Sequence, residues 1–164
     1  MYKIARDGKP QLLLREIILK LEAVKNKKLP LFIDLMDKRP MGIDSWRGDY
    51  GELSIQTEDF GQYNTGIVKE KTPYGDMHEM KIIGCENPTT AEWIGVLKEA
   101  VGKMFVGFKG GDFLMSEDTP VYLAEYGEAY FKTGDKIADR VYFVDVREDA
   151  DKVYLITELV YYFN

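Results

Sequence analysis

The strongest constraint on the fold lies near the C-terminus, where two β-rich runs carry apolar side chains on both faces. Val141–Arg147 and Val153–Tyr162 are rich in Val, Ile, Leu, Phe and Tyr, which pleated strands favour. The short polar connection Glu148–Asp151 between them predicts an antiparallel hairpin. Because apolar residues occupy both faces, the hairpin needs a helical layer on one face and a second layer, or a partner, on the other.

Two segments have the periodicity of amphipathic helices that could form the helical layer. From Pro10 to about Lys25, apolar residues recur three and four positions apart, which is the spacing of one helix face. A second helix is expected from Thr89 to Met104. Its start is indicated by Thr89 and Glu92, which have the spacing of a capping box. Both helices are expected to pack on the same sheet.

The other β-type segments complete that sheet. Further strands are expected in short runs of β-branched, aromatic or alternating residues at Leu31–Met36, Glu52–Thr57, Phe113–Met115 and Val121–Tyr126. Residues 58–88 contain turn signals around two short apolar runs and are expected to form a hairpin-like insertion. A length of 164 residues is typical of one domain. We therefore predict a single α+β domain, residues 1–164, with an antiparallel sheet packed against two main helices.

Charge and composition argue against several classes of protein. The chain has 22 Lys and Arg and 28 Asp and Glu, and the resulting net charge of −6 speaks against nonspecific binding to nucleic acid. The single cysteine, Cys85, excludes an intramolecular disulfide and a Cys-based metal site within one chain. The sequence shows neither a signal peptide nor an apolar run of about 18 residues. We expect a cytoplasmic protein that does not enter a membrane.

The first candidate binding segment is the loop-like stretch at residues 44–52. The Arg47 guanidinium is a planar donor suited to phosphate or carboxylate, and Trp46 and Tyr50 offer flat faces for stacking. With Asp49 they form the first part of the predicted site. The alternative is that Arg47 pairs with a neighbouring acid to pin the loop, while the aromatic rings fill the core.

The second candidate segment, residues 105–113, contains paired glycines after a lysine. The amides of Gly110 and Gly111 could form a nest that holds an anion, to which Lys109 adds positive charge. Alternatively, the glycines form a turn between two strands. The segment lacks the spacing of a P-loop or a Rossmann fingerprint. The predicted site takes Lys109, Gly110, Gly111, Asp112 and Phe113 from this segment.

Tyr122 joins the predicted site because a tyrosine ring can stack a base while its hydroxyl forms a hydrogen bond; a core role is the alternative. Catalysis has less support. The only histidine, His78, has no acid or nucleophile beside it at a fixed spacing, which argues against a triad. Asp112, Glu117 and Asp118 could bind Mg²⁺, although acids in turns are commonly solvated. We predict no catalytic residue, no cofactor and no metal site.

Three strings in these segments occur in the order Gly42–Leu53, Val106–Phe113 and Asp118–Tyr122. In this order they resemble a family of small accessory proteins of tailed bacteriophages. The resemblance implies a viral accessory protein that acts in an infected bacterium, where such proteins often disarm host defence. It brings no catalytic residues, because none are known to us for that family.

The resemblance and the candidate residues together predict an anti-defence protein that binds and sequesters a small anionic nucleotide-like immune signal without turnover. Arg47 and Lys109 would contact phosphate, and an aromatic ring would stack the base. One alternative is an inhibitor that blocks a host defence enzyme through an acidic, tyrosine-rich surface. Another is a metal-dependent phosphoesterase. The double-faced C-terminal strands also predict a homo-oligomer.

Overall fold

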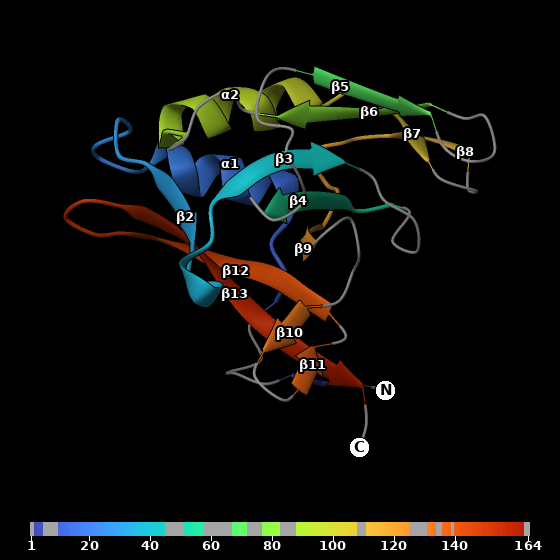
Figure 1. Ribbon diagram of the computed structural model, residues 1–164. Helices are drawn as coiled ribbons and strands as arrows, with labels where there is room; N and C mark the ends of the chain where they lie inside the picture. The colour runs from blue at the N-terminus through green and yellow to red at the C-terminus, as the bar shows by residue number, and fades with distance from the viewer. Residues whose placement is uncertain are drawn as a thin grey trace.

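Figure 1 shows the computed structural model of the chain. It describes residues 2–4, 10–44, 51–57, 67–71, 77–82, 88–107, 111–124, 131–133, 136–138 and 140–162. The helices in this part are α1 (Leu14–Glu22), α2 (Thr90–Ala100) and the short 3₁₀ helix η1 (Leu35–Asp37). The strands are β1 (Tyr2–Ile4), β2 (Leu31–Ile33), β3 (Pro40–Asp44), β4 (Leu53–Thr57), β5 (Ile67–Lys71), β6 (Met77–Ile82), β7 (Met104–Gly107), β8 (Gly111–Leu114), β9 (Val121–Ala124), β10 (Phe131–Thr133), β11 (Lys136–Ala138), β12 (Arg140–Glu148) and β13 (Val153–Tyr162).

Most described strands form one sheet, in the order β1-β13-β12-β9-β4-β3-β6-β5, with β2 paired to β13. The α+β class is confirmed, but the expectation of an antiparallel sheet is wrong because β4 pairs with β9, and β13 with β2, in parallel. Parallel neighbours require a long crossover. The crossover between β4 and β9 contains β5, β6, α2, β7 and β8. Periodicity within single segments cannot reveal such a pairing.

The predicted C-terminal hairpin is confirmed, since β12 and β13 pair antiparallel along their length. Both of its faces are buried. Val141, Phe143 and Leu155 belong to the main core beneath the helices. Tyr142 and Val160 belong to a smaller cluster on the opposite face, which we call the second face. The two-sided cover inferred from the sequence is therefore present within one chain.

Helix α1 begins later than its apolar pattern suggested. The N–H of Leu12 donates to Phe143 O at 2.8 Å, and its carbonyl accepts from Val121 N at 3.2 Å, which holds this segment extended between two strands. The helix therefore starts at Leu14 rather than Pro10, and Glu16 Oε1 caps it by accepting from Leu13 N at 2.8 Å. The predicted stripe Leu14, Ile17, Ile18, Leu21 and Val24 is buried in the main core.

Helix α2 begins as predicted and ends early. Thr89 Oγ1 accepts from Glu92 N at 3.1 Å, which confirms the capping box. The helix ends at Ala100, because Gly102 adopts a positive φ of 82° and donates its N–H to Met115 O at 2.7 Å. Glycine is favoured in this left-handed conformation just beyond a helix. Met104, expected on the helix, instead begins β7 and is exposed.

Other strands also differ from expectation. The run expected at Leu31–Met36 stops at Ile33, where η1 follows. The alternation in Glu52–Thr57 is typical of a half-buried strand, but both faces of β4 are buried. Within residues 58–88, β5 and β6 form an antiparallel hairpin, and β6 also pairs with β3 in the main sheet. Among the described residues, no helix is long and apolar enough to cross a membrane.

Candidate functional site

The predicted site residues fall into two groups. Those outside the described residues are Trp46, Arg47, Asp49, Tyr50, Lys109 and Gly110, and Cys85 also lies outside. Gly111 and Asp112 begin β8, and Phe113 follows them, partly buried against the main core. Tyr122 lies in β9 and is 0% exposed. The structure thus describes the strands that flank the two candidate segments.

The strands that flank the two candidate segments are connected through β6. Asp44 at the end of β3 pairs with Ser54 in β4, so the first candidate segment connects two neighbouring strands. Gly107 and Gly111 pair across β7 and β8, which flank Lys109. Strand β6 pairs with β3 and contacts β7, which links the two regions. In Figure 1 the end of β3, the start of β4 and the β7–β8 hairpin are all on the right of the view.

A largely buried ion pair lies where the first candidate segment enters β4. Gly51 has a positive φ of 91°, and Glu52 follows it directly. Glu52 Oε1 pairs with Arg140 Nη2, and the two side chains are only 16% and 17% exposed. Gln11 Nε2 also donates to Glu52 Oε1, at 2.9 Å, and to Val121 O, at 3.0 Å. Residues from separate parts of the chain therefore fix the base of this segment.

The ion pair borders a row of buried polar side chains on the second face. The strand registers place Ser54, Tyr122, Tyr142 and Glu158 opposite one another across β4, β9, β12 and β13. All are at most 5% exposed. The Arg140 guanidinium carbon lies 5.5 Å from the centre of the Tyr122 ring, a cation–π distance. One face of Tyr122 is thus taken by Arg140, which leaves at most the other for a base.

Sequence reasoning missed Glu52, Arg140 and Glu158 as site residues. For Glu52 the sequence did contain a signal, because polar and apolar residues alternate in Glu52–Thr57. Such alternation is typical of a strand with one face in solvent. Because β4 lies between β3 and β9 and is covered on both sides, its polar side chains are buried instead. Polar groups retained in such a position are candidates for function.

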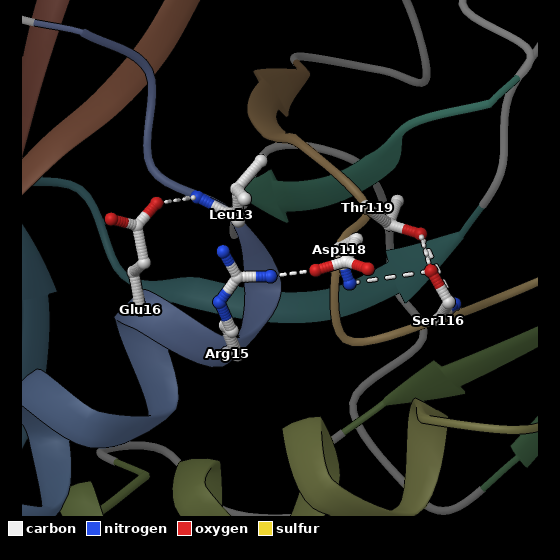
Figure 2. A network of polar contacts seen from close by, with 6 residues as sticks. All are labelled: Leu13, Arg15, Glu16, Ser116, Asp118 and Thr119. Atoms are coloured by element: carbon white, nitrogen blue, oxygen red, sulfur yellow. Dashed lines mark hydrogen bonds and ion pairs between the residues drawn. The ribbon is translucent and has the colours of Figure 1, made fainter.

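The third string of the resemblance has a structural role that Figure 2 shows. Ser116 and Thr119 form a turn in which Ser116 N donates to Thr119 Oγ1 at 3.1 Å. Arg15 at the start of α1 forms an ion pair with Asp118, and Leu14 N donates to Thr119 O at 2.8 Å. The turn therefore docks on α1 and directs the chain into β9. In the described part of the chain, no group of three or more His, Cys, Asp or Glu side chains could hold a metal ion.

The β12–β13 turn has its own electrostatic contacts. The backbone N–H groups of Lys25 and Asn26 donate to the Glu148 carboxylate at 2.9 and 3.0 Å and lower its pKa. A hydrogen bond with Asp37 raises the pKa of Lys152. Burial, followed by a hydrogen bond with Asp37, raises the pKa of Tyr154. These contacts connect the β12–β13 turn and its flanks to the residues just after α1 and to η1.

Comparisons with known proteins add no functional assignment. No protein-family model matches the chain, and no curated protein or solved structure is significantly similar to it. The resemblance to phage accessory proteins therefore stays a prediction. Function has to be inferred from the chemistry of the two candidate segments and of the buried groups beside them.

Proposed function

We propose that this protein is a phage anti-defence protein that binds and sequesters a small anionic nucleotide-like immune signal without turnover. The main support is the largely buried Glu52–Arg140 pair at the base of the segment that contains Arg47. Binding costs less conformational entropy when the residues beside the site are already held in place. Preorganisation of this kind suits tight capture.

The arrangement of the flanking strands supports a single shared site. The described ends of the strands that flank both candidate segments lie on the right in Figure 1, and β6 pairs with β3 and contacts β7. A phosphate group would find the Arg47 guanidinium in one segment and the Lys109 ammonium with the glycine amides in the other. Because the net charge is −6, such local positive groups are needed to attract an anion.

The two alternatives have less support. An inhibitor with a tyrosine-rich surface would lack Tyr122 and Tyr142, which are buried. A phosphoesterase that bound a metal ion through Asp118 would first have to break the ion pair between Asp118 and Arg15. The homo-oligomer predicted from the sequence also has less support, because the second face, which was expected to need a partner, is already buried within one chain.

Native mass spectrometry of protein purified from infected cells tests the proposal. We expect a bound nucleotide-like anion that heat denaturation releases intact. Arg47→Ala and Lys109→Ala should each remove it and leave the melting temperature unchanged. Lys28→Ala is the control: it removes a positive charge in the α1–β2 connection, outside both candidate segments, and this variant should retain the bound anion.

Each alternative predicts a different result of this experiment. Release of cleaved products would indicate an enzyme, and co-purification of a host protein without a small molecule would indicate an inhibitor. Loss of the fold in both Arg47→Ala and Lys109→Ala would show that these residues are structural. Any of these results contradicts sequestration through Arg47 and Lys109.

A further inference from the structure

The outer side of α1 carries an exposed leucine between two ion pairs. Leu19 is the most exposed large hydrophobic side chain in the described part of the chain, at 63%. It lies between Arg15 and Glu22, and the spacing of these three residues places them on one face of the helix. Arg15 pairs with Asp118 at one end of this face. Glu22 pairs with Lys98 at the other, so each end carries both signs of charge.

Helix α2 lies beside α1 and runs antiparallel to it. Ala91 N, at the start of α2, donates to Lys27 O, just beyond the end of α1, at 3.0 Å. Further along α2, Lys98 Nζ lies 2.6 Å from Glu22 Oε2. A step towards the C-terminus of α2 is therefore a step towards the N-terminus of α1.

This arrangement places a second exposed apolar side chain level with Leu19. Val101 follows Lys98 by three residues, and Leu19 precedes Glu22 by three, which is about one helical turn in each case. Val101 is 37% exposed. The surface that we call the helix face thus has an apolar centre and charged ends, and it consists of Arg15, Leu19, Glu22, Lys98, Val101 and Asp118.

The charges of the helix face match those of a second copy of the chain. Along α1 the face is positive at Arg15 and negative at Glu22, with Leu19 between them. In a copy related by a two-fold axis near Leu19, α1 runs in the opposite direction, so Arg15 of each copy meets Glu22 of the other. The same operation brings the two Leu19 side chains together. The face is therefore complementary to itself in charge and in polarity.

The charge of the whole chain also favours this face for contact between copies. Two chains that each carry a net charge of −6 repel one another. On the helix face the two positive and two negative groups cancel, so two copies can meet there without local repulsion. An apolar centre with a charged rim is typical of protein interfaces.

We infer that the helix face is an interface at which two copies of this chain form a symmetric dimer with antiparallel α1 helices. This dimer differs from the homo-oligomer expected from the sequence, which would have used the second face. The inference goes beyond the proposed function and does not depend on it, because no residue of the helix face belongs to the two candidate segments.

Sedimentation equilibrium of the full chain tests the dimer. We expect the wild type to dimerise at concentrations between about 1 and 100 μM. Leu19→Arg places like charges at the centre of the interface and should weaken the dimer about tenfold or more. Ala150→Arg is the matched control, because it adds the same charge at an exposed position in the β12–β13 turn and should leave the dissociation constant unchanged. Circular dichroism should show the same fold in all three proteins.

A mixing experiment tests the antiparallel arrangement. Arg15→Glu and Glu22→Arg each bring like charges together when two identical copies meet, so each variant alone should dimerise about tenfold more weakly. In an equal mixture the two variants bring opposite charges together at both contacts, and native mass spectrometry should show mainly the mixed dimer. Each variant loses its own ion pair within the chain to the same extent alone and in the mixture. The mixed dimer therefore reports contacts between copies.

A wild type that stays monomeric over this range would overturn the inference, and a protein of the infected cell bound at the helix face instead would identify a different occupant. A dimer that Leu19→Arg weakens no more than Ala150→Arg forms through another surface, which also overturns it. If Leu19→Arg does not fold, Leu19→Ser, which removes the apolar group, has to show the loss. Mixed dimers no more abundant than random pairing gives would refute the antiparallel contact.

Discussion

Replacing Arg140 with methionine should lower the free energy of unfolding, because it leaves the largely buried Glu52 carboxylate without its positively charged partner. Both side chains are about one-sixth exposed, at 17% and 16%, and removal of one partner of a buried ion pair costs roughly 3–5 kcal/mol. Gln11 still donates to Glu52, so we expect the lower limit, about 3 kcal/mol. For a chain of this length that loss lowers the melting temperature by about 6–12 °C.

Glu52→Gln and the double variant complete a thermodynamic cycle. A buried pair replaced on both sides loses little stability, so the double variant should be more stable than Arg140→Met alone. Urea unfolding followed by circular dichroism gives each free energy of unfolding. We expect a coupling energy of about 2 kcal/mol between the two positions. Additive effects, with a coupling below about 0.5 kcal/mol, would refute the view that this pair fixes the base of the candidate segment.

Two further predictions concern local contacts. Thr89→Ala removes the hydroxyl that accepts from Glu92 N and should cost about 1 kcal/mol in thermal unfolding; an unchanged melting temperature would contradict the cap. Glu148→Gln should lower stability at pH 7, because the hydrogen bonds from Lys25 and Asn26 lower the folded pKa of Glu148 below its ordinary 4.5. This stabilisation is present above the unfolded pKa and is lost as the pH falls through the folded pKa. The difference between wild type and variant should therefore shrink at pH 3, and a difference that grows there would contradict this linkage.

Local patterns in the sequence predict the elements that depend on near neighbours. The Thr89 capping box and the β12–β13 hairpin follow from residues a few positions apart, and both are confirmed. The start of α1 could not be predicted in this way. Hydrogen bonds from Leu12 to β9 and β12 keep the first residues of the apolar pattern extended, and these partners lie more than a hundred positions away.

The candidate site shows the same limit. Arg47 and Lys109 can be predicted as phosphate-binding residues without knowledge of the fold, because each is a positively charged residue beside glycine. Arg140 begins a strand and, by residue type alone, would be placed in solvent. Its importance appears only once the fold places it over the Tyr122 ring of β9 and in an ion pair with Glu52.

The parallel contact between β4 and β9 also has a consequence for how the chain acquires its structure. The centre of the sheet forms only when β4 pairs with β9, and these two strands are more than sixty residues apart in the sequence. Pairing over such a sequence separation slows folding. A chain cleaved between these strands should yield two pieces that fold poorly alone and reassociate when mixed, since each keeps one half of the interface.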